Sequence, residues 1–244
     1  RLIDNDATAG YELAIPVAAS IKNIEIIDII GNSSVTADTS DTTAFAGVTH
    51  LYTTSTGANT STAAATTNIN ATANGTAAAD TIIVKGGKDV TVVSKNNVAD
   101  TITVGGTTAA AGKVSVTSTG GTANGDTQGN IAVTGGTEIT VNQYAGNAAA
   151  IGNNTIGGTV TVTGNASTTT VTVNQTATAT GANATATTAG VVGYTAGTVT
   201  IADVNAGTAN ANTISTVTLK NAGAATVDSN ALSTLNLEGT LVTV

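Results

Sequence analysis

The chain has 244 residues, long enough for one or two domains. Fifteen acidic residues against seven basic ones give a net charge of −8, which disfavours binding to nucleic acid or to an anionic membrane surface. The sequence contains no cysteine, which excludes disulfides and zinc–thiolate sites, and no apolar run long enough for a transmembrane segment.

The apolar residues make up 41% of the sequence but include only one Phe, four Tyr, no Trp and no Met. A core built from Ala, Val, Ile and Leu, without large side chains to fill irregular gaps, has to be narrow and regular. Only 9% of the residues are charged, and Thr, Asn, Ser and Gly fill the polar positions. This composition predicts a folded chain rather than a disordered one.

The first fifty residues differ from the rest. The most apolar run, IKNIEIIDII, covers residues 21–30, and the only proline, Pro16, lies just before it. We therefore predict an N-terminal cap or the first coils over residues 1–52 and a repetitive body over residues 53–244. The chain begins without Met or a signal-peptide pattern, so we expect it to be a fragment of a longer chain.

Further along the chain, apolar side chains recur at every second position in short runs. Alternation of Val, Ile and Leu with Thr predicts β-strands. The predicted strands contain the pairs Ile82/Val84, Val90/Val92, Ile102/Val104, Val114/Val116, Ile131/Val133, Ile139/Val141, Val160/Val162, Val171/Val173, Val199/Ile201, Val217/Leu219, Ala225/Val227 and Leu235/Leu237. Gly-Gly, Gly-Asn and Asn-Gly pairs between them predict turns, since no Lys-Ser/Thr follows as in a phosphate loop.

Two phrases are repeated. Ala-Asp-Thr-Ile occurs at Asp80 and again at Asp100, and Asn142-Gln143 recurs as Asn174-Gln175. Such echoes predict stacked coils whose equivalent residues form ladders. We therefore predict an all-β fold, a right-handed parallel β-solenoid (β-helix) with two or three short strands per coil and irregular loop insertions, such as residues 176–188. An antiparallel β-sandwich has similar strand spacing and is the alternative, but the repeats and the scarcity of aromatics favour the solenoid.

Three aspartates lie in or just before turns rich in Gly, Asn or Ala: Asp80, Asp100 and Asp126. Turn carboxylates and backbone carbonyls supply the oxygen ligands that Ca²⁺ prefers, which makes these residues candidate metal ligands. Each aspartate also fits an Asx-turn or a cap at the start of a strand. The sequence leaves both interpretations open.

Catalysis is not predicted. His50 is the only histidine, and the sequence identifies no nucleophile and acid that would converge on it. A polysaccharide-cleaving enzyme would combine an acid cluster with aromatic and basic side chains, and this chain has five aromatic and seven basic residues. We therefore predict a non-enzymatic protein with no catalytic residues.

The segment from Ile131 to Gly239 includes the phrases VTGNASTTTVTV and AATVDSNALSTLNLEGT. It resembles the central region of the RTX-type surface-layer (S-layer) proteins of Gram-negative bacteria. Two upstream phrases, VAASIKNIEIIDIIGNSSVTADTS and GVTHLYTTST, resemble the same proteins in the same order.

The resemblance implies the β-solenoid body of a structural protein on the bacterial cell surface, exported by type I secretion. It implies self-assembly with copies of itself into a two-dimensional lattice, bound Ca²⁺, and attachment to lipopolysaccharide through domains outside this chain. The RTX repeat Gly-Gly-x-Gly-x-Asp does not occur here, so no calcium position is transferred. A large secreted RTX-type adhesin that binds host or carbohydrate ligands is the alternative function.

Overall fold

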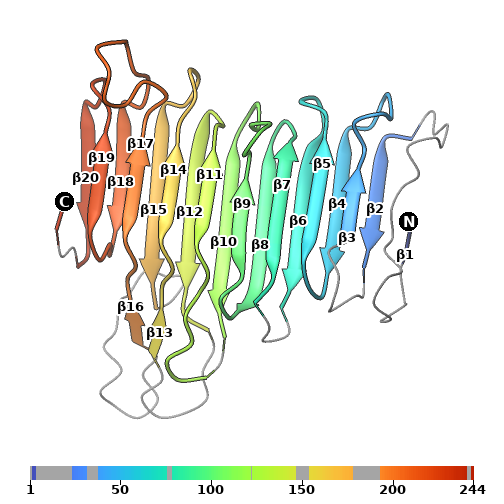
Figure 1. The fold of residues 1–244 in the computed structure, drawn as a ribbon, viewed down its shortest axis with the longest axis horizontal. Coiled ribbons are helices and arrows are strands. Elements are labelled where there is room, and N and C mark those ends of the chain that lie inside the picture. The colour runs from blue at the N-terminus through green and yellow to red at the C-terminus, as the bar shows by residue number, and fades with distance from the viewer. Residues whose placement is uncertain are drawn as a thin grey trace.

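A computed structural model describes residues 2–3, 24–31, 38–75, 79–121, 123–146, 154–177, 193–240 and 243–244. Every regular element in these residues is a β-strand, and none is a helix. The strands stand side by side along the long axis of the molecule (Figure 1) and form two long sheets, one behind the other.

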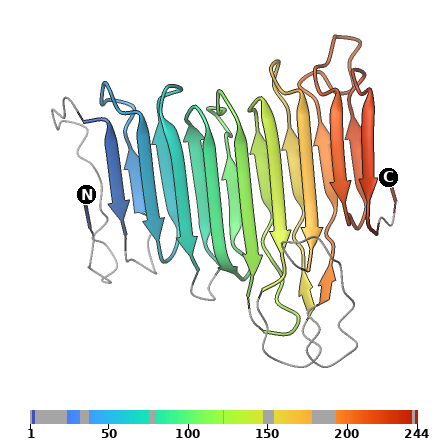
Figure 2. The same cartoon turned by 180° about the vertical axis from the view of Figure 1, so that it is seen from behind.

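We name the ten-stranded sheet A and the eight-stranded sheet B. Sheet A consists of β1 (Leu2–Ile3), β2 (Ile26–Ile30), β4 (His50–Ser55), β6 (Asn68–Asn74), β8 (Val90–Asn97), β10 (Val114–Gly120), β12 (Glu138–Tyr144), β15 (Thr170–Thr176), β18 (Thr216–Lys220) and β20 (Thr234–Glu238). Sheet B consists of β3 (Asp38–Asp41), β5 (Asn59–Ala63), β7 (Thr81–Gly86), β9 (Thr101–Val104), β11 (Ile131–Thr134), β14 (Val160–Thr163), β17 (Val199–Ala202) and β19 (Ala225–Asp228). The short strands β13 (Asn154–Ile156) and β16 (Gly193–Thr195) pair with each other beyond the lower end of the sheets, as the view from behind also shows (Figure 2).

All strand pairs in the described residues are parallel. From β2 to β20 the chain alternates between the two sheets, with β13 and β16 added to two of the coils, so that each of these coils contributes one strand to each sheet. This arrangement confirms the prediction of a parallel β-solenoid. The antiparallel sandwich is wrong, because in-register copies of the same strand stack on one another instead of folding back as hairpins.

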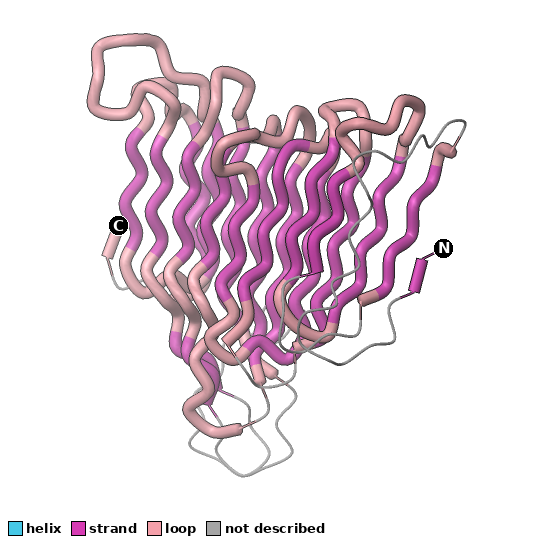
Figure 3. The backbone as a smooth tube through the Cα atoms, turned by 45° about the vertical axis from the view of Figure 1, so that its right-hand side comes forward, coloured by secondary structure: helices cyan, strands magenta, loops and turns pink. Residues whose placement is uncertain are grey.

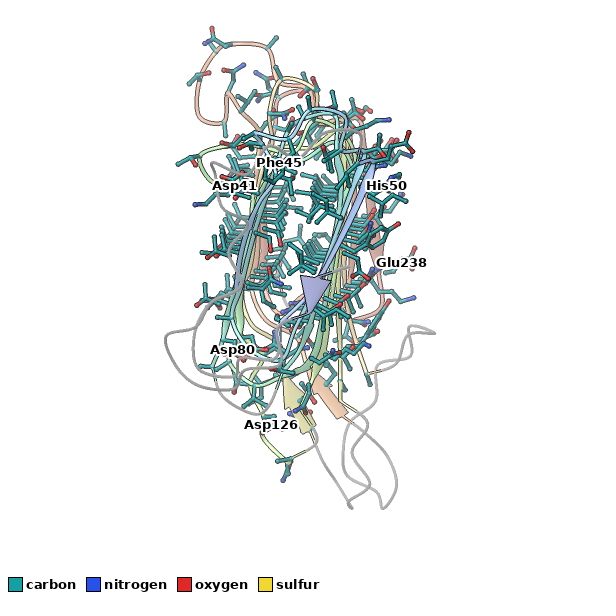
Figure 4. All side chains as sticks on the ribbon, turned by 90° about the vertical axis from the view of Figure 1, so that its right-hand side faces the viewer. Asp41, Phe45, His50, Asp80, Asp126 and Glu238 are labelled. Carbon is teal, nitrogen blue, oxygen red and sulfur yellow. The ribbon has the colours of Figure 1, made fainter. Side chains whose placement is uncertain are left out.

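Each of the predicted alternating runs is a strand. Their apolar side chains point between the sheets and form continuous rows, which the view along the axis shows as stacked layers (Figure 4). One row of sheet B contains Ile82, Ile102, Ile131, Val160 and Val199, all 0% exposed. Burial of such a side chain contributes on the order of 2 kcal/mol relative to an exposed one, so these rows are the main source of stability.

Buried polar side chains lie between β4 and β5. Thr53 Oγ1 lies 2.9 Å from Ser61 Oγ across the two sheets, and Ser61 Oγ donates to Asn59 Oδ1 at 2.8 Å. All three side chains are buried. The sequence pattern did not predict β3, β4, β5 or β6, because small polar residues occupy inward positions of the first three and alanines follow Ile69 at those of β6.

Strands β2 and β4 belong to the same sheet as the later strands, so these two strands continue directly into the body. Of the expected cap, residue 1 and residues 4–23 and 32–37 lie outside the described residues.

Coil length varies widely while the register is kept. Val171 is paired with Val217, 46 residues later, whereas Ser215 and Ser233 are joined across a coil of 18 residues. The tube view shows loops of different size at the ends of strands that remain aligned (Figure 3). The turns between the sheets therefore absorb the insertions. Most of the loop insertion expected over residues 176–188 lies outside the described residues.

The last strand of sheet A differs from the others in its burial. Leu235 and Leu237 occupy the inward register positions next to Val217 and Leu219, yet they are 39% and 47% exposed. Since no described strand follows β20 in sheet A, the alternation predicted this strand correctly but not the exposure of its side chains.

Candidate functional site

The repeated phrase around Asp80 and Asp100 places both aspartates at the turns that carry the chain from sheet A to sheet B. Thr81 of β7 is the register partner of Thr101 of β9, so the two aspartates are adjacent rungs of one ladder. The backbone N–H of Asp80 donates to Asp100 Oδ1 at 3.0 Å. The structure thus brings together two of the three predicted metal ligands.

Both carboxyl groups of this pair are buried: Asp80 is 9% exposed and Asp100 1%. Burial is the main effect that raises the pKa of Asp100 to about 6. Hydrogen bonds from the Asp80 N–H and the Ser94 hydroxyl lower this pKa, whereas the neighbouring charge of Asp80 raises it. Burial also raises the pKa of Asp80. Two stacked carboxylates in a poorly solvated corner repel each other unless a proton or a cation lies between them.

Asp80 Oδ2 is buried and has no hydrogen-bond partner among the described residues. A carboxylate oxygen in that position is costly to leave unpaired, and a cation would satisfy it. Three oxygens lie close together beside Gly75. A Cβ added to this glycine would lie 3.1 Å from Asp100 Oδ2, 3.0 Å from Lys95 O and 3.1 Å from Asn96 O. The donors are hard oxygens that suit Ca²⁺, although they supply fewer than the six to eight ligands that Ca²⁺ takes.

Asp126 lies in a different turn, between β10 and β11, at the same lower end of the cross-section as Asp80 (Figure 4). Its Oδ2 accepts a hydrogen bond from the Ala123 N–H at 2.8 Å and packs against Gly121. This bond joins the side chain to the backbone of its own turn, a local structural role, although the donor precedes Asp126 by three residues and the geometry is not that of an Asx-turn. No three Asp, Glu, His or Cys side chains converge on one point in the part of the chain that the structure describes.

A second cluster, which the sequence pattern did not reveal, lies around His50 on the outer face of sheet A. A pocket of about 240 Å³ is lined by His50, Tyr52, Asn68, Ile69, Asn70, Asp89 and Thr91. These residues come from three consecutive strands of sheet A and the turn before β8, and only the stacking of coils places them together.

Hydrogen bonds hold the ring of His50 on both sides. His50 Nδ1 lies 3.0 Å from the Thr49 hydroxyl, which donates to Glu25 O. Asn68 Oδ1 accepts from the Asp89 N–H, and Asn68 Nδ2 lies 3.2 Å from His50 Nε2. The two neighbours fix the orientation of the imidazole ring.

Asp203 is a third residue that the sequence did not single out. It is 2% exposed, and Oδ2 accepts hydrogen bonds from the Thr213 and Ile214 N–H groups and from Ser229 Oγ, while Oδ1 accepts from the Val204 N–H. Burial alone would raise the pKa of Asp203, but the four donors outweigh it and hold the pKa below its usual value. The carboxylate ties a long turn to the following coil and has a structural role.

Replacing Asp203 with Asn is expected to destabilise the protein by about 2 to 4 kcal/mol at pH 7, because an amide cannot accept from four donors. Since the folded pKa is lowered, the stabilisation is complete above the ordinary value of 3.8 and is lost as the pH falls below it. Urea denaturation at several pH values measures both effects. Asp228→Asn, which removes an exposed carboxylate at the end of β19, is the control; equal losses in the two variants would contradict the assignment.

Comparison with known proteins adds no relative: no protein-family model matches the chain, and no curated protein is significantly similar to it. Among the described residues no helix is long and apolar enough to cross a membrane.

Proposed function

We propose that this chain is the solenoid body of a structural protein of a bacterial surface layer, which assembles with copies of itself into a two-dimensional lattice. The observation that carries the proposal is the pair of regular outer faces, whose central rows carry few charges. The central row of sheet A contains Asp28, Tyr52, Asn70, Thr91, Ser115, Thr140, Thr172, Thr218 and Asn236, of which Asp28 alone is charged. The central row of sheet B contains Thr60, Ile83, Thr103, Ala132, Thr161, Thr200 and Thr226.

Such faces suit contact between copies. The strands stay nearly parallel along the whole stack (Figures 1 and 3), so each face is a broad and regular surface. Thr and Asn can exchange hydrogen bonds with water for hydrogen bonds with a neighbour, and Asp28 at the N-terminal end is the one charged side chain of the two described central rows that would have to be desolvated. A body built mainly from two long sheets of paired strands is also stiff and offers a protease few open segments.

The resemblance of the sequence to RTX-type S-layer proteins supports the same proposal and extends it. It implies a protein outside the cell, on the bacterial surface, after type I secretion, with lipopolysaccharide held by domains outside this chain. The solenoid fold agrees with what the resemblance implied.

We assign the proposed calcium dependence to Asp80 and Asp100, whose oxygens would hold the ion at the lower corner of the solenoid. Asp100 is almost inaccessible, so an ion held there would stabilise the stacking of the β7 and β9 coils rather than bridge two molecules. Calcium would then favour the lattice indirectly, because a rigid body loses less conformational entropy on assembly.

Electron microscopy of the purified chain, with Ca²⁺ and with excess chelator, tests the assembly. Ordered sheets or oligomers are expected with Ca²⁺ and are expected to disappear with chelator, with a matching shift in size-exclusion chromatography. Monomers under both conditions would contradict self-assembly by this chain.

Lysine substitutions locate the contact face. Thr161→Lys in sheet B or Thr172→Lys in sheet A is expected to abolish the ordered sheets without lowering the melting temperature, since either change puts a charge between uncharged neighbours of a central row. Thr208→Lys, in an exposed loop, is the matched control. Sheets that survive both face substitutions would show that the faces are not lattice contacts.

The adhesin remains the second candidate, and one observation favours it: the pocket beside His50 and Tyr52 has the aromatic lining that the sequence alone did not suggest.

A further inference from the structure

We propose that the pocket lined by His50, Tyr52, Asn70, Asp89 and Thr91 binds a neutral saccharide unit. This inference does not depend on lattice assembly, because the pocket is complete within one molecule.

The pocket has an aromatic wall. The rings of His50 and Tyr52 are parallel within 8°, with their centroids 6.0 Å apart, and Tyr52 is 39% exposed. The two hydrogen bonds to His50, from Asn68 and with Thr49, fix the imidazole, and its ring in turn supports the Tyr52 ring. A sugar ring carries C–H groups on its faces and hydroxyl groups around its rim, so an exposed and immobilised aromatic ring is a suitable platform for one of its faces.

Polar groups that are still available line the same pocket, in part along the row of sheet A that contains Tyr52. Asp89 Oδ1 accepts from the Lys113 N–H, which leaves Oδ2 for a ligand. The side chains of Tyr52, Asn70 and Thr91 form no hydrogen bond to another described residue. A phenol, an amide, a hydroxyl and a carboxylate around one pocket match the donors and acceptors of vicinal sugar hydroxyls.

Charge selects the kind of saccharide. Among the side chains that line the pocket, one is a carboxylate and none is Lys or Arg, and the whole chain carries a net charge of −8. Uronic acids, sialic acids and phosphorylated sugars would be repelled. The volume of about 240 Å³ is small, so one or two sugar units fill it, and the dissociation constant is expected on the order of a millimolar.

Nuclear magnetic resonance tests the proposal directly, because His50 is the only histidine of the sequence and its ring gives a single set of signals. The chain, kept monomeric with chelator, is titrated with a panel of neutral, acidic and phosphorylated oligosaccharides. A neutral saccharide is expected to shift the His50 ring signals in a saturable manner, whereas the acidic and phosphorylated members are not.

Variants distinguish specific binding from a general effect. Tyr52→Ala is expected to weaken binding at least tenfold, Tyr52→Phe to keep most of it, and Asp89→Asn to weaken it several-fold. Tyr144→Ala, which removes a half-buried tyrosine from the outer face of the same sheet, is the matched control and should leave the affinity unchanged. Melting temperatures verify that each variant is folded.

Two results would overturn the proposal. One is the absence of any shift at neutral saccharide concentrations about ten times the expected dissociation constant. The other is binding that Tyr52→Ala leaves intact, or that only acidic sugars produce. Failure of the lattice experiment with success here would support the adhesin, and the reverse result would leave the structural proposal standing.

Discussion

Replacing Gly158 with alanine is expected to destabilise the protein by about 3 kcal/mol or more, which corresponds to a fall of roughly 10 °C in the melting temperature. An added Cβ would lie 2.6 Å from the carbonyl oxygen of Gln128 and overlap the carbonyl oxygen of Gly129. Both oxygens are backbone atoms of the preceding coil, so they cannot move aside without separating the coils.

Gly158 belongs to a row of glycines at the lower corner of the solenoid. The register of sheet B stacks Gly129, Gly158, Gly197 and Gly223 on one another, and at each of them an added Cβ would meet the backbone of the coil before it. The row allows successive coils to approach closely where the chain crosses from one sheet to the other.

Thermal and urea denaturation of Gly158→Ala measure the effect. Gly207→Ala is the control, because Gly207 has a φ of +72° but no atom within 4 Å of an added Cβ. The free energy of unfolding of that control should fall by only about 1 kcal/mol, which is the cost of placing alanine in a left-handed backbone conformation. If the free energy of unfolding falls equally in both variants, close packing of the corner is not the cause of the destabilisation.

Replacing Asp100 with asparagine is expected to stabilise the metal-free protein at pH 7 by up to roughly 3 kcal/mol. The folded pKa of Asp100 is about 6, above the ordinary 3.8, so the folded state holds this proton more strongly than the unfolded state does. The stabilisation that protonated Asp100 gives the folded state is therefore complete below pH 3.8 and is lost as the pH rises through about 6. Asparagine has nearly the same shape and no charge to bury.

Urea denaturation in chelator between about pH 4 and pH 7 measures this difference. The stability of the wild type is expected to fall relative to that of Asp100→Asn over this interval. Asp228→Asn removes an exposed carboxylate and controls for the change in net charge. A variant that is less stable than the wild type at neutral pH, without metal, would contradict the burial argument.

The same variant tests the calcium assignment. Excess Ca²⁺ is expected to stabilise the wild type and to leave Asp100→Asn unchanged, because a ligand that binds only the folded state raises its stability. Equal stabilisation of both proteins would place the ion elsewhere and leave Asp80 and Asp100 as a buried carboxyl pair.

Two ladders were predictable from repeated phrases. Asn174 Nδ2 donates to Asn142 Oδ1 at 2.7 Å, and Gln175 Nε2 donates to Gln143 Oε1 at 2.6 Å, as the echo in the sequence implied. The pairing of Asp80 with Asp100 follows from the same reasoning. Where the same local sequence returns in the next coil, equivalent side chains must stack.

Other features were not predictable. Gly157-Gly158 was expected to be a turn, yet neither residue has a positive φ, and their role is the close approach of two backbones. The pocket beside His50 unites residues from three coils, and no short motif carries it. Nor could the pattern show which carboxyl groups are buried, since burial depends on the coils above and below.

The sequence by itself determined the class of fold, because alternation of β-branched residues with Thr is a local property of each strand and the repeats require stacking in parallel. It did not determine which coils meet, because turns lengthen at little entropic cost and one coil can span 18 residues and another 46. Only the tertiary structure decided that Asp80 and Asp100 are buried, that Asp126 binds the backbone of its own turn, and that His50 and Tyr52 form one wall of a pocket. The physical reason is that packing between coils sets the register, which cannot be deduced from the number of residues between two strands.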